Sequence, residues 1–583
     1  MNNEPIEKLE ESNLQYMEKI LSYELLIHKG SPFELQDMAI EGIPCKVFPR
    51  GPQTLRDVFL KAVSFAERDF IVKDDMRLSF GQAFRCGKYF ARLLRQKNNI
   101  KKGSRTALIA ETGPEWAIAF MALCFAGAVP VIIPADAEKQ VIEKAIELTN
   151  CELIISDLHS AHKIDAALMK RRLVIPVMRL GDTLSYIGAS SGFSIVNLGD
   201  APNCKQAALD DDDVCETMPE DEALISFTSG TTGEPKGVIH SHRNMTTGLM
   251  NMMLGGMIMS FRAAKDGAKR ATSAQAASLL ISPFSHIGGY SQLMLMSYLG
   301  GKIVLLPEWE PQRAAVLIEY ESIRSLSGLS PAMALDLLRA NLSTGQLRSL
   351  TNLNIHGLAP RKKFIREIKE SFPQINLTIS YGMTETCGAV SVVSGMELLD
   401  KPQLAGRILP STQVKIVEQN GREAAIGSQG EIFIRGAMVM RAYCSGKSDY
   451  SSGILENGWL KTGDRGYVDS AGNLYITGRM DELQLGIKRL SSGELEQLIC
   501  ELDTIDEATV MEVKNFGRQS GIFVTVIPNN QIPVDEQELA QEVSACINAY
   551  ADNINVAIMN DLPRAASGKV NRRALQSAAV QRL

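Results

Sequence analysis

The sequence predicts an α/β protein that carries a smaller α+β unit at its C-terminal end. Three observations lead to this fold class. From residue 105 onward, short apolar segments alternate with helix-length segments, which is typical of a mostly parallel sheet covered by helices. From about Gln403 the sequence changes to short strands separated by turns, which indicates a small antiparallel unit. After about residue 480, strands combine with an amphipathic helix, which predicts a compact further domain.

The elements follow in chain order from a leader of residues 1–54, which is helix-like and then extended. Residues 55–98 are predicted to be helical and charged, and the alternation begins after them. The predicted strands are 106–110, 129–133, 152–156, 224–227, 279–282, 302–306, 353–356, 377–380, 413–417, 430–436, 508–513 and 521–526. The predicted helices are 115–125, 139–150, a methionine-rich helix after residue 242, 313–320, 331–342 and 535–550.

Composition and charge exclude several classes of protein. The chain has 583 residues, too many for one hydrophobic core, and its 45% hydrophobic and 22% charged content is ordinary for a soluble globular protein. A net charge of -6 gives no basis for binding nucleic acid or an anionic membrane. The 10 cysteines are scattered without a Cys-x-x-Cys pair, which fits a reducing cytoplasm rather than a disulfide framework or a zinc site.

One apolar segment, residues 116–135, has the length of a membrane span. Gly127 and Pro130 divide it, so we expect a buried helix followed by a buried strand and no membrane span. The N-terminal residues contain no apolar signal core, and we expect a cytoplasmic protein. The acidic residues between 210 and 222 are expected to form a solvated linker. His240 and His242 would share one face of a strand, but without a visible third ligand a metal site is not expected there.

A loop of hydroxyls and glycines follows the predicted strand 224–227. Its residues are Thr228, Ser229, Gly230, Thr231, Thr232, Gly233, Glu234, Pro235 and Lys236. Hydroxyl donors, glycine backbone and a mobile lysine are the groups that a triphosphate requires. The spacing differs from that of a Walker loop, because the lysine stands three residues after the last glycine and no serine or threonine follows it. Taken alone, the loop is also compatible with an ordinary turn between two strands.

Four further clusters support a nucleotide site, and three of them have a structural alternative. Residues 380–386 offer an aromatic ring for a base, a hydroxyl for phosphate and a carboxylate for Mg²⁺, or else a strand-to-helix cap. Residues 459–464 end in a carboxylate after a tight glycine turn, which suits the two hydroxyls of a ribose or is only a turn aspartate. Residues 475–481 lie at the predicted domain junction. Residues 563–570 present Lys569 on a loop, where an isolated lysine is usually only a surface charge.

Together and in this order, these motifs resemble the acyl-adenylate-forming, AMP-binding superfamily, which includes acyl-CoA synthetases, nonribosomal-peptide adenylation domains and firefly-type luciferases. The resemblance covers residues from about 55 to 575. It implies a large N-terminal domain of layered αβ sheets with a small β-barrel, residues 55–478. A hinge, residues 479–482, and a mobile C-terminal α+β lid domain, residues 483–583, would follow.

The resemblance also implies a role for individual residues. The implied phosphate-binding residues are Thr228, Ser229, Gly230, Thr231, Thr232, Gly233 and Lys236, with Thr384 beside them and Glu385 on Mg²⁺. The residues implied to frame the nucleoside are Ala359, Pro360, Tyr381 and Gly382 at the adenine, and Asp464 with Arg479 nearby at the ribose. Lys569 would stabilise charge as a carboxylate attacks ATP, Asp481 would be the hinge residue, and His286 would border the acyl tunnel.

Two segments depart from the family's pattern. The adenine segment Gly357-Leu-Ala-Pro360 has a leucine where the family usually has glycine, which could narrow the wall of the nucleotide or acyl site. The segment after the hinge is about one residue short, so that Gly486 is displaced or Ile487 replaces it. A glycine there normally lets the backbone approach the pantetheine arm, so this departure bears on the thioester-forming step.

The expected function is that of an ATP-dependent acid–CoA ligase acting on a fatty or other hydrophobic carboxylic acid. It would form an acyl-AMP, release pyrophosphate and pass the acyl group to CoA, so ATP, Mg²⁺ and CoA are the implied cofactors. Two alternatives remain open: a ligase that loads the phosphopantetheine of a carrier protein, and a catalytically silent nucleotide-binding scaffold. The joint presence of Lys569, Glu385 and Asp464 speaks against the scaffold.

Overall fold

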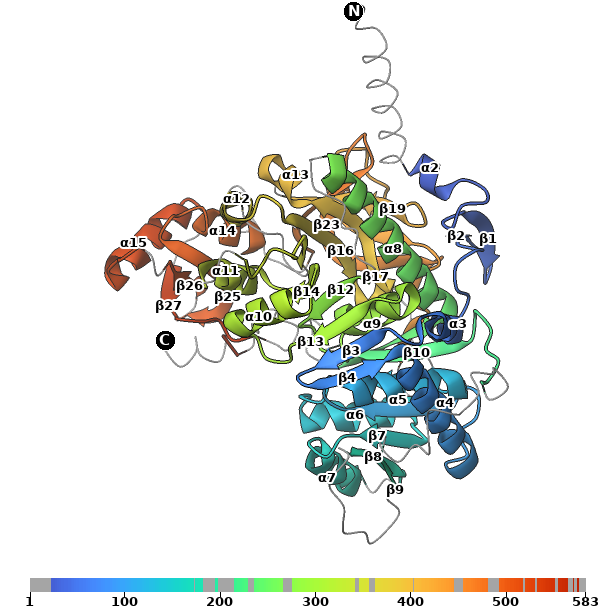
Figure 1. Ribbon diagram of the computed structural model, residues 1–583. Coiled ribbons are helices and arrows are strands. Elements are labelled where there is room, and N and C mark those ends of the chain that lie inside the picture. Colours follow the sequence, from blue (N-terminus) through green and yellow to red (C-terminus); the bar gives the residue numbers. More distant parts are fainter. Residues whose placement is uncertain are drawn as a thin grey trace, which may run out of the picture.

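The computed structural model has a two-stranded sheet and two large sheets in one large part, and a three-stranded sheet in a C-terminal part (Figure 1). It describes residues 23–171, 174–181, 194–197, 214–228, 235–265, 275–340, 345–355, 362–401, 403–444, 455–480, 492–516, 519–529, 532–550, 554–564, 570 and 574–575. The described chain begins with a short helix, α2 (Glu24–Ile27), and a hairpin of β1 (Gln36–Ile40) and β2 (Ile43–Val47).

The first sheet has the strand order β21-β11-β10-β6-β5-β7-β8-β9. Its strands are β5 (Arg105–Ile109), β6 (Val129–Ile132), β7 (Leu153–Ser156), β8 (Val177–Gly181), β9 (Ser194–Asn197), β10 (Glu222–Thr228), β11 (Lys236–Ser241) and β21 (Ala442–Cys444). The strands from β10 to β9 pair in parallel, whereas β11 is antiparallel to both β10 and β21. The mostly parallel sheet predicted from the alternating pattern is therefore confirmed.

The second sheet has the order β19-β20-β23-β24-β18-β17-β16-β15-β14-β12-β13-β3-β4, with β22 paired to β23. Its strands are β3 (Asp69–Lys73), β4 (Met76–Ser79), β12 (Ala277–Leu280), β13 (Lys302–Leu305), β14 (Ser325–Leu329), β15 (Asn352–Ile355), β16 (Asn376–Met383), β17 (Gly388–Ser394), β18 (Leu404–Ile408), β19 (Gln413–Val417), β20 (Gly430–Arg435), β22 (Leu455–Glu456), β23 (Trp459–Val468) and β24 (Asn473–Arg479). The strands from β3 to β16 on this path pair in parallel, and those from β17 onward are antiparallel. The antiparallel unit predicted after Gln403 thus continues the second sheet through β16 and β17.

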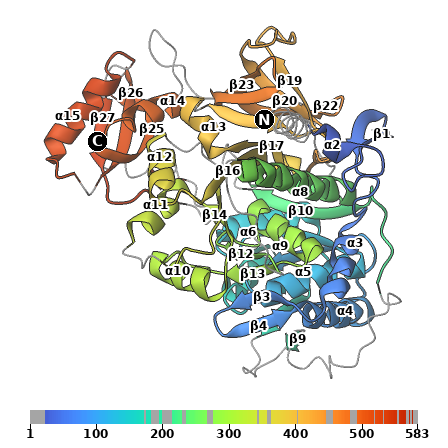
Figure 2. The same ribbon diagram turned by 45° about the horizontal axis from the view of Figure 1, so that its top comes forward.

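Helices cover these two sheets. They are α3 (Leu55–Leu60), η1 (Lys61–Phe65), α4 (Phe80–Lys97), α5 (Pro114–Ala126), α6 (Lys139–Thr149), α7 (Ala161–Arg171), α8 (His242–Lys265), α9 (Ile287–Leu299), α10 (Pro311–Tyr320), α11 (Pro331–Arg339), α12 (Lys362–Ser371), η4 (Thr384–Thr386) and α13 (Gly395–Asp400). Figure 2 shows α8 lying between β17 of the second sheet and β10 of the first.

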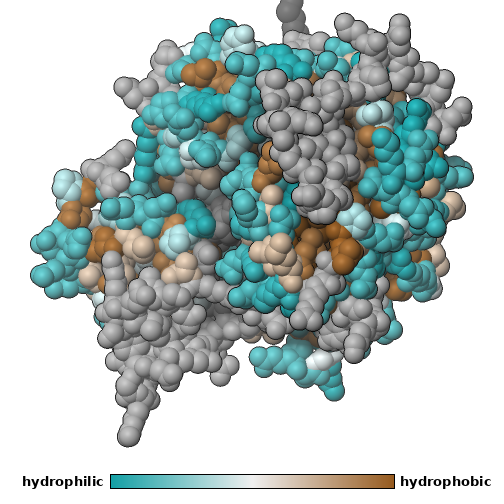
Figure 3. Space-filling model, turned by 90° about the horizontal axis from the view of Figure 1, so that it is seen from below, coloured by the Kyte–Doolittle hydropathy of each residue, from teal (hydrophilic) through white to brown (hydrophobic). Residues whose placement is uncertain are grey.

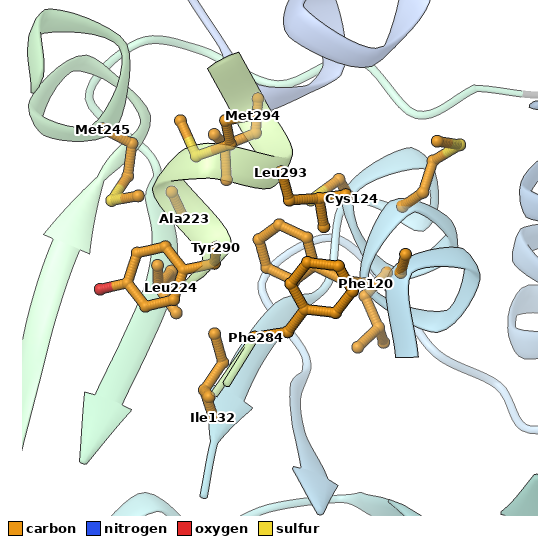
Figure 4. Packing of buried hydrophobic residues seen from close by; sticks show 14 of the residues in the cluster. Phe120, Cys124, Ile132, Ala223, Leu224, Met245, Phe284, Tyr290, Leu293 and Met294 are labelled. Atoms are coloured by element: carbon orange, nitrogen blue, oxygen red, sulfur yellow. The ribbon is translucent and has the colours of Figure 1, made fainter. Parts of the chain in front are cut away.

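The core between the sheets explains the apolar segment at residues 116–135. Every residue of α5 except Glu115 is buried, and β6 after it is buried along its whole length. In Figure 4, Phe120 of α5 packs near Phe284, and α9 adds Tyr290, which lies against Leu224 of β10. Because a helix buried on all sides needs no polar face, its uniform apolar sequence reflects packing. No helix among the described residues is long and apolar enough to cross a membrane.

The C-terminal part is a three-stranded sheet with helices. Its elements are α14 (Ser492–Ile499), β25 (Ile505–Phe516), β26 (Gln519–Pro528), α15 (Glu536–Ile547) and β27 (Ile554–Ile558). It lies beside α11 and α12 (Figure 1), where Arg339 donates to both carboxylate oxygens of Asp506 at 2.5 and 3.0 Å. The predicted α+β class is confirmed, while the domain boundaries and the mobility of this part stay predictions.

Three expectations about local structure are wrong. Residues 55–98 are not helical throughout, because the β3–β4 hairpin interrupts them and β3 joins the second sheet beside β13. Glu220 and Glu222 are not part of a free linker, since they form ion pairs with Arg243 and Arg105. His242 is the first residue of α8 rather than part of the strand that carries His240, which removes the argument that the two share one face.

Figure 3 shows one face of the molecule from below. Among the coloured residues, hydrophobic ones form several separate small groups between hydrophilic ones, and the surface is hollowed between the C-terminal part, at the left, and the rest. Two ion pairs cross between these two parts: Arg339 of α11 with Asp506, and Lys363 of α12 with Asp503.

Candidate active site

The candidate active site is built where the ends of the two large sheets meet. The hydroxyl- and glycine-rich loop leaves β10 and returns to β11, and the last Cα partners of this pair are Thr228 and Lys236. The loop therefore does join two antiparallel strands, and its function must be argued from its neighbours. Its residues Ser229, Gly230, Thr231, Thr232 and Gly233 lie outside the described residues.

A tyrosine connects the lysine of β11 to the acidic turn of the second sheet. Tyr443 of β21 donates a hydrogen bond of 2.6 Å to Oε1 of Glu385, and the Lys236 Nζ lies 5.3 Å from the centre of the same ring. Burial, followed by the charge of Glu385, raises the pKa of Tyr443 above its ordinary value, so the phenol stays a donor. Tyr443 thus contacts a cation through its ring and a carboxylate through its hydroxyl.

The turn that carries Thr384 and Glu385 is fixed by its backbone. Strand β16 ends at Met383, and η4 begins at Thr384, which is buried. The Met440 N–H donates 2.8 Å to the Glu385 carbonyl oxygen, so the segment before β21 supports both the main chain and the side chain of this residue. Gly382 lies so close to β17 that an added Cβ would stand 1.9 Å from the Gly388 carbonyl oxygen.

A second cluster surrounds Asp464. The Tyr381 hydroxyl donates 2.6 Å to Oδ2 of Asp464, and Arg479 Nη1 donates 2.6 Å to Oδ1. Burial and the nearby Asp464 carboxylate raise the pKa of Tyr381 well above its ordinary value. Asp464 and Arg479 are Cα partners of β23 and β24, so strand pairing itself brings the acid and the base together. The predicted proximity of Arg479 to Asp464 is confirmed.

The glycine before this aspartate lies in a bulge, and the predicted tight turn is wrong. Opposite β20, the pairing skips from Lys461 to Arg465, so β23 has three residues where β20 has only Ile432. Gly463 makes the bulge possible with φ of 71°, a left-handed conformation that favours glycine. Asp464 of this bulge accepts the hydrogen bond of Tyr381 from β16, although β24, β18 and β17 lie between β23 and β16 in the sheet order.

A short stretch of chain joins the two clusters. Tyr381 is four residues before Glu385, so their Cα atoms are at most about 14 Å apart. One cluster offers an aromatic hydroxyl and a carboxylate, as a nucleoside requires, and the other offers a lysine, a hydroxyl and a carboxylate, as phosphates with a cation require. No group of three or more His, Cys, Asp or Glu side chains within the described ranges could hold a metal ion by itself. A single carboxylate suits Mg²⁺, which is commonly held by one or two carboxylates together with substrate phosphates.

The remaining predicted residues have different outcomes. His286 is the N-cap of α9, where its Nδ1 accepts a hydrogen bond of 3.3 Å from the Gly288 N–H, and its place beside a tunnel stays a prediction. Ala359, Pro360, Asp481 and Lys569 lie outside the described residues, as do Gly486 and Ile487.

Sequence reasoning missed Tyr443 because nothing in its local sequence distinguishes it. Its role depends on β21 pairing with β11, a contact between segments about two hundred residues apart. Its neighbour across that pair is Val238, two residues after Lys236, so the lysine and the tyrosine meet through strand register alone.

The fold combines two large sheets, which carry these two clusters, with a separate C-terminal part. The family model described as AMP-binding enzyme matches residues 59–444. The chain therefore belongs to the AMP-binding enzyme family and is an ATP-dependent acyl-adenylating ligase. This confirms the resemblance noted from the five motifs.

Individual relatives agree with this assignment. A 4-coumarate–CoA ligase-like 9 of Arabidopsis thaliana is 29% identical over 365 residues, 62% of this chain and 62% of that protein. The 4-coumarate–CoA ligase CCL1 of Humulus lupulus is 24% identical over 510 residues, 83% of this chain and 86% of that protein.

Solved structures share the fold. The anthranilate CoA ligase AuaEII in complex with anthranoyl-AMP has a TM-score of 0.74 at 18% identity, covering 91% of this chain and 98% of that chain. The amide bond synthetase McbA from Marinactinospora thermotolerans has a TM-score of 0.72 at 20% identity, covering 90% and 99%.

Proposed function

We propose that the protein is an acid–CoA ligase that activates a hydrophobic carboxylic acid. The observation that carries the proposal is the pair of clusters at the sheet ends, Tyr381–Asp464–Arg479 and Lys236–Tyr443–Glu385, in a chain of the AMP-binding family. The relatives are 4-coumarate–CoA ligases, which supports CoA as the acceptor and an apolar acid as the substrate.

In the first step, a carboxylate oxygen of the acid attacks the α-phosphorus of ATP. The bond from this phosphorus to the bridging oxygen breaks, and pyrophosphate leaves with the electron pair, so that an acyl-AMP remains. Because anions approach one another in this step, catalysis consists mainly of positioning and charge neutralisation.

The chain's own residues supply that neutralisation. Lys236 and the loop Thr228 to Gly233 would hold the phosphates with Thr384, and Glu385 would hold Mg²⁺, which neutralises phosphate charge when bound. Asp464 would accept the ribose hydroxyls, and Tyr381 would lie by the adenine together with Gly382, Ala359 and Pro360. Lys569 would approach the attacking carboxylate and the α-phosphate.

In the second step, the CoA thiolate attacks the acyl carbon and AMP leaves as the acyl–oxygen bond breaks. Admission of the thiol would require rotation of the C-terminal part about Asp481. His286 would border the acyl tunnel. A carrier-protein phosphopantetheine presents the same thiol, and the shortened segment at Gly486 and Ile487 keeps this acceptor as the second candidate.

Product analysis tests the proposal. The protein is incubated with ATP, Mg²⁺ and a panel of aryl and aliphatic acids, and mass spectrometry follows acyl-AMP, AMP and acyl-CoA with and without CoA. We expect an acid that yields acyl-CoA and equimolar AMP. Accumulation of acyl-AMP that only a carrier protein discharges would favour the carrier ligase, and absence of any adenylate would support the silent scaffold.

A further inference from the structure

A buried histidine of the first sheet contacts a buried cysteine that lies two residues after Glu385 in the chain. His240 of β11 is fully buried, and its Nδ1 lies 3.1 Å from the Sγ of Cys387, which is 2% exposed. His240 is four residues after Lys236 on the same strand, and Cys387 is two residues after Glu385. The contact therefore ties the strand that begins with the lysine to the turn that carries the carboxylate.

Both partners are neutral, so the contact is an ordinary hydrogen bond and not an ion pair. Burial lowers the pKa of His240 to about 3, and the backbone of Thr384 opposes this shift. Burial also raises the pKa of Cys387 well above its ordinary value. The interaction consequently keeps one form across the physiological pH range.

The backbone of Cys387 has an unusual conformation for a residue with a side chain. Cys387 ends η4 with φ of 52°, the left-handed region in which glycine is the favoured residue. Among the described residues with positive φ other than glycine, only Tyr23 and Cys387 are buried. The left-handed backbone favours glycine at this position, and the contact of the thiol with His240 is a physical reason for a cysteine there.

Helix α8 packs closely against the turn at Cys387. An added Cβ on Gly248 of this helix would stand 2.4 Å from the Cys387 carbonyl oxygen. The Cys387 Sγ is also 3.6 Å from the Sδ of Met245, the α8 residue labelled in Figure 4. Glu385 itself accepts hydrogen bonds from the Tyr443 hydroxyl and the Met440 N–H.

We propose that His240 and Cys387 are positioning residues, which set the Thr384–Glu385 turn at a fixed distance from Lys236 so that a metal-bound triphosphate is gripped from both sides. The inference rests on the proposed function in that the ligand is ATP with Mg²⁺. It differs from a purely structural capping role, because it makes the metal-dependent part of ATP binding sensitive to the hydrogen bond between the two side chains.

The test compares two cysteine variants of similar size. Cys387→Ser keeps a hydroxyl that can donate to His240 Nδ1 or accept from it, whereas Cys387→Ala keeps the Cβ and loses the hydrogen bond. Calorimetry measures the Kd for ATP in EDTA and in excess Mg²⁺, and their ratio gives the metal-dependent gain in affinity. We expect Cys387→Ala to reduce this gain about three- to tenfold and Cys387→Ser to retain it within about twofold, as a single hydrogen bond predicts. AMP affinity, which depends on Asp464, should not change in either variant.

Three further variants complete the experiment. His240→Leu should lower the metal-dependent gain in affinity about as much as Cys387→Ala does. The double variant should lower it no further than either single variant, because both changes remove the same contact. Ser322→Gly, which replaces an exposed residue of the same φ of 52°, controls for relief of backbone strain and should leave the gain unchanged.

Equal effects of the serine and alanine variants, additive effects of the histidine and cysteine changes, or a wild-type Kd for ATP that does not respond to Mg²⁺ would each overturn the inference. The binding readout needs no carboxylic acid. A protein that shows the metal-dependent pattern but no adenylate with any acid would therefore contradict the proposed function and not the positioning role.

Discussion

Removal of one hydroxyl, in Tyr443→Phe, tests the link between Lys236 and Glu385. The substitution deletes the hydrogen bond of 2.6 Å to the Glu385 carboxylate and keeps the ring that lies 5.3 Å from Lys236 Nζ. A hydrogen bond to a charged group contributes about 1.5–3 kcal/mol. Because Glu385 is half-buried and can regain water, the lower end applies, which corresponds to about a tenfold loss of rate.

The assay is acid-dependent ATP–pyrophosphate exchange at saturating acid with varied Mg²⁺ concentration. Tyr443→Leu, which also removes the ring, should be slower again by about two- to fivefold, since a cation–π contact at such a site contributes roughly 0.5–1 kcal/mol. Tyr467→Phe is the matched control on β23, where the ring stacks on Tyr475 at 4.6 Å. If Tyr443→Phe and Tyr467→Phe exchange at the same rate as the wild type, the reasoning about Tyr443 is refuted.

Three more predictions follow from the site and the core. Asp464→Asn should raise the Kd for AMP about tenfold or more, measured by calorimetry, since a charged acceptor is lost; an unchanged Kd would contradict its ribose role. Gly382→Ala should lower the unfolding free energy by more than about 2 kcal/mol in a urea titration, because its Cβ would meet a backbone carbonyl at 1.9 Å, whereas Gly256→Ala, with open space around it, should not destabilise. Burial holds the pKa of His240 at about 3 and that of His242 at about 4, so the unfolded chain binds protons first and stability should fall as pH drops from about 6.5 toward 4. At pH 5 the loss is about 2 kcal/mol for each histidine, and His242→Gln should flatten the profile; an identical profile would count against this origin.

Much of the fold could be predicted because its signals are local. The alternation of apolar strands and helices is set by which residues a covered parallel sheet must bury, and α5 with β6 shows this directly. The β3–β4 hairpin was missed because its pairing with β13 depends on a strand more than two hundred residues later in the chain. Short strands between charged residues carry too little periodicity to reveal such a partner.

The site divides in the same way. Glu385, Asp464 and the residues of the glycine-rich loop belong to motifs that could be recognised by their own neighbours in sequence. Tyr443 and the His240–Cys387 pair could not, because each contact crosses from the first sheet to the second and depends on three-dimensional register. The sequence around Gly463 predicts a turn where the structure has a bulge, because both accommodate a glycine with positive φ.

Acid-dependent exchange of labelled pyrophosphate into ATP tests the central claim most directly, because it reports the reversible formation of an acyl-AMP and no other step. The account predicts exchange that requires both Mg²⁺ and a hydrophobic carboxylic acid, and that Lys569→Ala abolishes while ATP still binds. Lack of exchange with every aryl and aliphatic acid, by a protein that binds ATP, would contradict it.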